Sequence, residues 1–319
     1  MAIDLRDVPE EKQTYEMCLA SVMADGQQLQ YVNAKFQTEE LCMKAVQEDG
    51  WALRYVKDQT FAICLEAVKQ DPWVLKDVRV QTPEICLKAI EQEGEVLQFI
   101  KDQTPEICLA AVEQTGTALQ YVQDQTPEIC FAAIKQTGWD KRILTYVKNQ
   151  TPEICLAAVS QNGNALEYVH DQTPEICLAA IEQYGKAIQY VKQQTPELCR
   201  KAVKTWGYAI RHIKEQTPEL CLLAVKQNGY ALEYVKERTP EVCLAAVKQT
   251  GYALQFIPDA QQTLPMAIAA LKRNPNSRKF LADQFRTPDV YKAAGCDYKP
   301  EDIAPLQSRA ESERSEPRH

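Results

Sequence analysis

Residues 104–125 read TPEICLAAVEQTGTALQYVQDQ, and this 22-residue pattern recurs with small changes along most of the chain. One cysteine marks each regular copy: Cys18, Cys42, Cys64, Cys86, Cys108, Cys130, Cys155, Cys177, Cys199, Cys221 and Cys243. The spacing is 22 residues in most steps, 24 after Cys18 and 25 after Cys130. Chance similarity does not hold phase over so many copies, so the chain is a tandem repeat array.

Each repeat carries the local signals of two short helices, as residues 217–238 illustrate. Thr217 is a good N-cap, and Pro218 suits the first helical position because its missing N–H costs nothing there. Gly229 is predicted to end this helix in the left-handed conformation. A second helix of about eight residues follows, and the sequence leaves open whether it is α or 3₁₀.

Neither helix is long enough to persist alone, because isolated helices below about 12 residues are marginal in water. Stacking of each repeat on the next supplies the missing burial. We therefore predict an all-α fold, an α-solenoid of about twelve 22-residue helix–turn–helix repeats. One turn is expected to be built differently, because Pro72 replaces the glycine and proline cannot take a positive φ.

The array divides the chain into four parts. Residues 1–13 form an N-terminal extension, 14–262 the regular repeats, 263–299 divergent C-terminal repeats, and 300–319 a polar tail predicted to be disordered. No apolar run is long enough for a membrane helix, and the N-terminus lacks the apolar stretch of a secretory signal. We expect a cytoplasmic protein that does not interact with membranes. Its oligomeric state stays open.

The cysteine ladder has two interpretations. Thiolates bind soft metals such as Cu(I) or Zn(II), which would make the ladder a metal-binding or redox-sensing device. However, no CxxC pair occurs, and thiols on stacked helices about 8–10 Å apart are too distant for shared coordination or a disulfide. The favoured interpretation is that cysteine fills a small apolar slot, unpaired and in a reducing compartment.

Catalytic chemistry has little support in the sequence. Only three histidines occur, His170, His212 and His319, and no glycine-rich phosphate loop, GxSxG or HExxH motif is present. Many carboxylates recur once per repeat directly after a Thr-Pro pair, where they suit a helix start. We expect no enzyme activity, no catalytic residues, no cofactor and no metal site.

Aromatic residues flank the glycine between the two helices of several repeats. This slot varies between otherwise uniform repeats, and tryptophan and tyrosine are effective interface anchors. We predict a scaffold that binds a protein or peptide partner through these rings and a variable polar face. The alternative is that the rings fold over neighbouring turns and complete the packing. The candidates are Trp51, Trp73, Trp139, Tyr184, Trp206, Tyr208, Tyr230 and Tyr252.

Basic residues gather in the ninth and twelfth repeats although the whole chain carries a formal charge of −8. Such patches can contact phosphate or an acidic protein. Nucleic acid is therefore an alternative partner, less favoured because the chain is acidic overall. The candidates in the ninth repeat are Arg200, Lys201, Lys204, Arg211 and Lys214.

Several phrases carry a family resemblance: AVKQNGYALEYV at 224–235, AAVSQNGNALEYV at 157–169 and AAVKQTGYALQFI at 245–257. They resemble a bacterial helical-repeat family, domain of unknown function 4116. In repeat length the chain also resembles leucine-rich-repeat-variant solenoids. Both resemblances imply an all-helical solenoid, and neither implies an activity or site residues.

Overall fold

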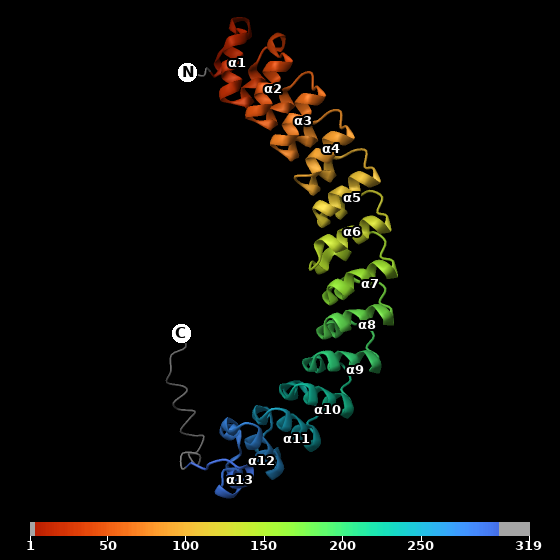
Figure 1. Cartoon of the computed structure of the whole chain (residues 1–319), viewed down its shortest axis with the longest axis vertical. Coiled ribbons are helices and arrows are strands. Elements are labelled where there is room, and N and C mark those ends of the chain that lie inside the picture. The colour runs from red at the N-terminus through yellow and green to blue at the C-terminus, as the bar shows by residue number, and fades with distance from the viewer. Residues whose placement is uncertain (1–3, 300–319) are drawn as a thin grey trace. The chain divides into compact units, whose positions relative to one another are not determined.

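The computed structural model describes residues 4–299, so the tail predicted at 300–319 lies outside the described residues. The chain divides into two compact units, Met1–Ala158 and Val159–His319. Figure 1 shows that the helices of each unit follow one another in the order of the chain. The described residues contain α-helices and 3₁₀ helices and no strand.

The N-terminal unit alternates α-helices with six-residue 3₁₀ helices. The α-helices are α1 (Tyr15–Ala24), α2 (Glu39–Glu48), α3 (Phe61–Gln70), α4 (Pro83–Ile90), α5 (Pro105–Gln114) and α6 (Pro127–Thr137). The 3₁₀ helices are η3 (Gly26–Tyr31), η5 (Gly50–Tyr55), η6 (Pro72–Asp77), η7 (Gly94–Phe99), η8 (Gly116–Tyr121) and η9 (Lys141–Tyr146). Shorter 3₁₀ turns are η1 (Leu5–Asp7), η2 (Glu10–Lys12) and η4 (Ala34–Phe36).

The C-terminal unit continues the pattern, and the division between the units falls within α7 (Pro152–Gln161). Its α-helices are α8 (Pro174–Gln183), α9 (Pro196–Thr205), α10 (Pro218–Gln227), α11 (Pro240–Gln249), α12 (Leu264–Arg273) and α13 (Pro288–Ala294). Its 3₁₀ helices are η10 (Gly163–Tyr168), η11 (Gly185–Tyr190), η12 (Gly207–His212), η13 (Gly229–Tyr234), η14 (Gly251–Phe256), η15 (Asp259–Gln261), η16 (Pro275–Phe280) and η17 (Asp283–Phe285).

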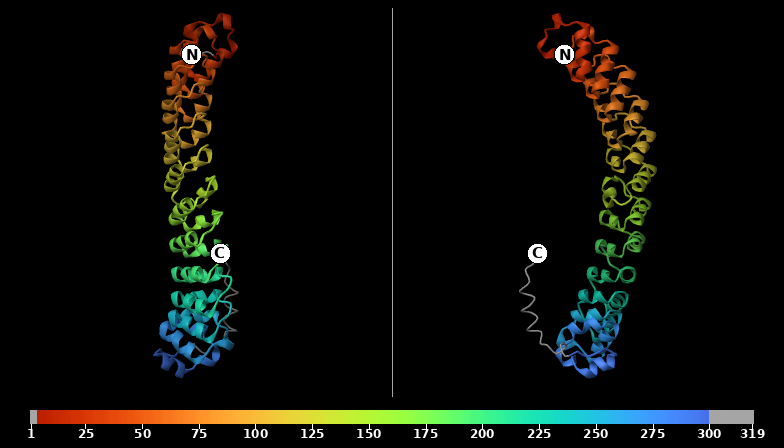
Figure 2. Two further views of the ribbon diagram at one scale, coloured as in Figure 1. Left: turned by 90° about the vertical axis from the view of Figure 1, so that its right-hand side faces the viewer. Right: turned by 60° about the vertical axis from the view of Figure 1, so that its left-hand side comes forward.

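Within the N-terminal unit each helix from α1 to α5 contacts the next α-helix, and within the C-terminal unit each helix from α8 to α12 does so. In both units every six-residue 3₁₀ helix contacts the next one of its unit. The two kinds of helix therefore form two parallel rows, and the stacking of successive helix pairs can be followed in Figure 2. This arrangement confirms the prediction of an all-α solenoid and shows that the second helix of each repeat is 3₁₀.

The repeat 217–238 shows why these residues form these elements. The Thr217 hydroxyl oxygen accepts a hydrogen bond from the Leu220 N–H at 3.3 Å, and Pro218 is the first residue of α10, as predicted. Small and branched apolar side chains then fill the space between the two rows and the neighbouring repeats. The buried side chains are Leu220, Cys221, Ala224, Val225, Ala231, Leu232 and Val235.

The prediction that Gly229 ends the first helix in a left-handed conformation is wrong. Asn228 precedes it in an extended conformation, with φ −149°, and caps η13 by accepting a hydrogen bond from the Tyr230 N–H. Within residues 4–299, positive φ occurs only at Gly138 and Gly295. Gly229 is required for space instead, since a Cβ there would lie 2.6 Å from the Ala246 carbonyl oxygen of the next repeat.

The same geometry explains Pro72, whose turn was expected to be built differently. Asp71 has φ −148° and ψ 115°, close to the φ −149° and ψ 112° of Asn228. Pro72 is the first residue of η6, a position where its fixed negative φ fits. The turn is therefore the ordinary one, and the expectation was wrong because it assumed a positive φ.

A glutamine clamp that the sequence analysis missed joins consecutive repeats. The side chain of Gln216, directly before Thr217, donates to the carbonyl oxygens of Ile210 at 2.9 Å and Tyr234 at 3.0 Å. Its Oε1 accepts from the Lys236 N–H at 2.9 Å. One side chain thus satisfies three backbone groups in two repeats. Glutamines equivalent to Gln216 make the same kind of bond to the following link: Gln13, Gln37, Gln59, Gln81, Gln103, Gln125, Gln172, Gln194 and Gln262.

Candidate functional site

Seven of the eight predicted aromatic candidates, all except Trp139, lie along one edge of their unit. We call this the turn edge, meaning the first residue of each six-residue 3₁₀ helix together with the residues directly before and after it. In the C-terminal unit it comprises residues 162–164, 184–186, 206–208, 228–230, 250–252 and 274–276. Because adjacent 3₁₀ helices are in contact, turn-edge side chains of consecutive repeats lie beside one another.

Four of the eight candidate rings pack against the following repeat. Each meets the ring near the end of the next 3₁₀ helix in an edge-to-face arrangement, with centroids 5.8–6.4 Å apart. Edge-to-face pairs at this distance stabilise beyond simple burial. These rings therefore have a packing role, as the alternative interpretation expected. The pairs are Trp73 with Phe99, Tyr208 with Tyr234, Tyr230 with Phe256, and Tyr252 with Phe280.

Trp51 is held by polar partners as well as by packing. Its indole Nε1 donates to the Asp71 carboxylate at 2.7 Å. The cations of Arg54 and Lys76 lie 4.9 Å and 4.6 Å from the ring centroid. This tryptophan, like Trp73, contributes to the joining of repeats two, three and four.

Tyr184 and Trp206 form a different arrangement, centred on one stack of rings. The two rings are 6.5 Å apart and nearly parallel, at 26°. His212 stacks on Trp206 at 6.2 Å and 24°, and Tyr208 leans against it at 5.8 Å. Tyr184 remains 39% exposed. The structure therefore brings three predicted candidates together into one partly exposed aromatic surface, which we call the Trp206 cluster: Tyr184, Trp206, Tyr208 and His212.

The surroundings of His212 favour the neutral form of its imidazole. Burial lowers the pKa of its imidazole, and the positive charges of Arg211 and Lys186 lower it further. Its Nε2 is buried and has no hydrogen-bond partner within residues 4–299. In equivalent positions other repeats carry tyrosine or phenylalanine, as at Tyr190 and Tyr234. His212 thus acts as an aromatic packing residue.

Trp139 belongs to the three-residue insertion of the sixth repeat. It lies between α6 and η9, directly after Gly138, whose φ is +52°. The Trp139 side chain is 78% exposed, the most exposed of the large hydrophobic residues in the described part of the chain. It belongs to the N-terminal unit, whereas the residues of the Trp206 cluster belong to the C-terminal unit.

A shallow polar cavity of about 630 Å³ continues the turn edge beyond the Trp206 cluster. Amide and hydroxyl side chains dominate its lining, with Arg273 as its charged residue. The Arg273 Nε donates to the Gln249 carbonyl oxygen at 3.0 Å, which fixes that guanidinium. The lining residues are Gln227, Asn228, Tyr230, Gln249, Thr250, Gly251, Arg273 and Asn274.

The structure divides the predicted basic residues of the ninth repeat among several places. Arg200 pairs with Glu219 of the next repeat at 2.7 Å, and Lys201 pairs with Glu182 of the preceding repeat at 2.5 Å. Arg211 lies over the Tyr234 ring at 4.9 Å. Lys204 is exposed on α9, and Lys214 lies in the link after η12.

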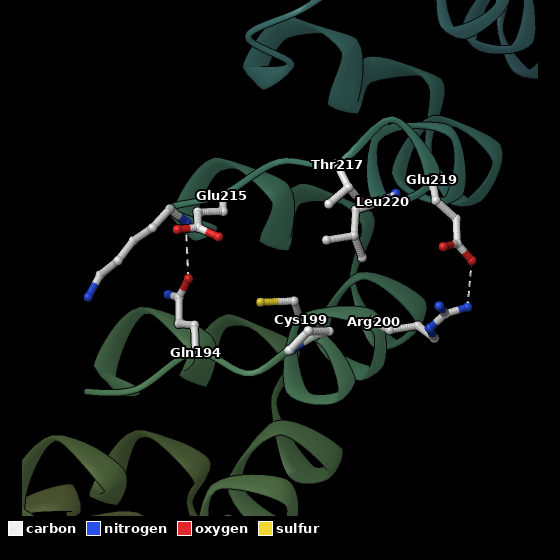
Figure 3. A pocket seen from close by; sticks show the side chains of 9 residues that line it. Gln194, Cys199, Arg200, Glu215, Thr217, Glu219 and Leu220 are labelled. Atoms are coloured by element: carbon white, nitrogen blue, oxygen red, sulfur yellow. Dashed lines mark hydrogen bonds and ion pairs between the residues drawn. The ribbon is translucent and has the colours of Figure 1, made fainter.

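Arg200 and Lys214 both line a cleft of about 280 Å³ between repeats nine and ten, shown in Figure 3. In Figure 3 the Cys199 side chain lies between Gln194 and Arg200. The Gln194 Oε1 accepts a hydrogen bond from the Lys214 N–H at 3.0 Å. Glu215 and Glu219 also line the cleft, so positive and negative groups alternate around it. Its mixed charge does not favour a phosphate ligand.

The cysteine ladder is buried. None of its eleven cysteines forms a disulfide within residues 4–299, and none is more than 5% exposed. Burial raises the pKa of the Cys42 and Cys86 thiols to about 11, and the nearby carboxylates of Asp58 and Asp102 add to the shift. In the part of the chain that the structure describes, no three His, Cys, Asp or Glu side chains converge to hold a metal ion.

Comparison with known proteins identifies a repeat family and no characterised relative. The model of the family described as domain of unknown function, DUF4116, matches residues 82–126, 151–194, 173–217 and 217–262. No curated protein and no solved structure matches. Over residues 4–299, no helix combines the length and apolar character needed to span a membrane.

Proposed function

We propose that this chain, whose repeats belong to the DUF4116 family, is a non-enzymatic scaffold that binds a protein or peptide partner at the Trp206 cluster. One observation carries the proposal. At two consecutive turns a large, partly exposed ring, Tyr184 or Trp206, stands at the position that a capping residue occupies in other repeats.

The residue before the first position of a 3₁₀ helix usually caps that helix. Asn162, Asn228 and Asn274 each accept a hydrogen bond from the backbone N–H two residues later. Tyr184 and Trp206 occupy the same position and make no such bond. A lost cap typically costs about 1 kcal/mol, so these two rings are not the choice that best stabilises their turns.

The composition of this surface suits a polypeptide partner. Its rings offer flat apolar area at low side-chain entropy, and the adjoining cavity supplies amides that can bond a peptide backbone. Nucleic acid is less well supported, because Arg200 and Lys201 are already paired with carboxylates. Buried cysteines that form no disulfide in the described part of the chain support a reducing, cytoplasmic location.

The test is the double substitution Tyr184→Asn and Trp206→Asn, which installs the residue found at three equivalent turns. This variant should stay folded, because each asparagine can cap its 3₁₀ helix while the ring stacking of the cluster is lost. It should also fail to capture the proteins that the wild type captures from extracts of the native cell.

The matched control is Glu93→Asn with Thr115→Asn, which adds asparagine at two turns that lack a side-chain cap, carry no ring there and lie outside the proposed binding surface. It should capture the same proteins as the wild type. Capture of those proteins by the Tyr184 and Trp206 variant at wild-type level would exclude this surface as the binding site.

A further inference from the structure

A row of lysines follows the α-helices of the C-terminal unit. Lys204, Lys226, Lys248 and Lys272 occupy the same position, in the last turn of the α-helix, in four consecutive repeats. All four are exposed. Because α9, α10, α11 and α12 contact one another in order, their equivalent positions form a row on one face, which we call the lysine row.

Acidic side chains occupy this position in other repeats, as at Glu91, Glu113 and Glu182. Lys69 and Lys135 hold the same position in two isolated repeats, but lysines in consecutive repeats occur only from Lys204 to Lys272. Within residues 4–299, no carboxylate lies within ion-pairing distance of these four lysines. The neighbouring cations Arg200 and Lys201, by contrast, are both paired.

An apolar groove runs between two of the helices that carry the row. Leu222 on α10 and Leu244 and Ala245 on α11 form its floor, and all three are half-buried. Lys226 and Lys248 line the same groove, which has a volume of about 450 Å³. Apolar floor and unpaired cations thus occur side by side on one surface.

We propose that this face of α9–α12 binds an acidic amphipathic helix of a partner protein. Stacked helices are about 8–10 Å apart, so the lysines recur at about that spacing. In a helix, residues seven apart share one face and are separated by about 10.5 Å, at 1.5 Å per residue. Carboxylates in that pattern match the lysine row, while same-face residues of a strand recur at about 6.7 Å and do not.

The groove also distinguishes the partner from other polyanions. Its leucine floor requires apolar side chains next to the carboxylates, which a phosphate backbone does not offer. Glu241 lines the groove as well, so the partner needs uncharged residues opposite Glu241 and carboxylates only opposite the lysines, which a backbone with a phosphate at every unit cannot offer. The inference concerns the α-helix face and does not depend on the turn-edge proposal.

The experiment is selection against the full chain from a display library of random peptides of about 18 residues, the length of a helix that crosses three helix spacings. Enriched peptides should combine apolar residues with Asp or Glu spaced about seven apart. Their affinity should fall about tenfold or more for the variant Lys204→Glu, Lys226→Glu, Lys248→Glu, Lys272→Glu.

A control variant with the same change in net charge carries Lys12→Glu, Lys57→Glu, Lys101→Glu and Lys135→Glu, all exposed lysines outside the row. It should bind the selected peptides as the wild type does. Circular dichroism should show that both variants stay helical.

The proposal is overturned if no peptide is enriched, if neutral or basic peptides are enriched, or if both variants lose affinity equally. It is also overturned if single-stranded RNA or anionic phospholipid vesicles bind the lysine row more tightly than the selected peptides. The Tyr184→Asn, Trp206→Asn variant should keep peptide binding, which separates this surface from the turn edge.

Discussion

Arg238 and Pro258 lack the hydrogen bond that joins the equivalent residues of most other links. Gln216, one repeat earlier, accepts the backbone N–H of Lys236, 20 residues further on. Arg238 stands in the glutamine position and has no acceptor to offer, while Pro258, 20 residues after it, has no N–H to donate. Arg238 still donates to the carbonyl oxygens of Leu232 at 3.2 Å and Phe256 at 2.9 Å, so it keeps the donor half of the clamp.

This relationship predicts a non-additive pair of substitutions. Arg238→Gln alone leaves the amide oxygen without its donor, and Pro258→Lys alone leaves an N–H opposite a guanidinium. Each should destabilise the protein, whereas the double variant restores the bond of the other links. The coupling free energy from thermal or urea unfolding should be on the order of 1 kcal/mol. Strictly additive effects would show that the two positions are independent.

Gly229 and Gly295 should respond differently to substitution by alanine and by asparagine. A Cβ at Gly229 would meet the Ala246 carbonyl oxygen, and the larger asparagine would worsen the clash, so Gly229→Asn should destabilise at least as much as Gly229→Ala. Gly295 ends α13 with φ +70°, and a Cβ there meets no atom within 4 Å. Asparagine tolerates this conformation better than alanine.

At position 295, the asparagine substitution should therefore lower the free energy of unfolding less than the alanine substitution, by a few tenths of a kcal/mol or more. The four variants are compared by their midpoints of thermal unfolding. An equal preference for asparagine at Gly229 and Gly295 would mean that backbone conformation, and not contact with the next repeat, selects glycine at position 229.

The cysteine ladder predicts a loss of stability in alkali. The folded chain raises the pKa of the Cys42 and Cys86 thiols from an ordinary value near 9 to about 11. The folded state therefore holds these protons more tightly than the unfolded state. Their contribution is complete below about pH 9 and is lost as the pH rises towards 11.

The measurement is the midpoint of thermal unfolding between pH 8 and 11. Cys42→Ala with Cys86→Ala should show a shallower fall than the wild type over this interval. At pH 8 a thiol reagent should first modify Cys296, which lies outside the ladder and is half-exposed. Rapid modification of the ladder thiols in the folded protein would contradict the burial on which this prediction rests.

Most of the architecture could be predicted because its signals are local and repeated. Thr217 and Pro218 define a helix start without reference to the rest of the chain, and cysteine spacing fixes the period. The role of Gly229 could not be read in this way. A left-handed turn and a close approach to Ala246 both require glycine, and only the position of the neighbouring repeat decides between them.

The glutamine clamp left a signal that could have been used. Glutamine precedes the threonine in nearly every repeat, although its position in a link between helices does not require it. A recurring amide in a link indicates backbone groups that need partners. The three backbone groups that each glutamine contacts belong to two repeats, so which groups they are depends on how the repeats stack.

The candidate site was predictable only as a set of residues. The sequence placed Trp73, Tyr230 and Trp206 in one class, because all three flank the same turn. The structure separates them by what they touch: the first two meet rings of the following repeat, whereas Trp206 gathers Tyr184, Tyr208 and His212 around itself. The lysine row crosses four repeats and became visible only when equivalent positions were aligned along stacked helices.

The central claim is that the folding unit is one whole repeat, supported by its neighbours through apolar stacking and the glutamine clamp. Excision of residues 104–125 tests it most directly, because Gln103 would then clamp the repeat that Gln125 clamps in the wild type. The account predicts a cooperatively unfolding, helical protein by circular dichroism. Excision of residues 104–114 alone, which removes α5 and leaves η8, should abolish cooperative unfolding. If the whole-repeat deletion loses its cooperative transition, or the half-repeat deletion keeps it unchanged, the claim is contradicted.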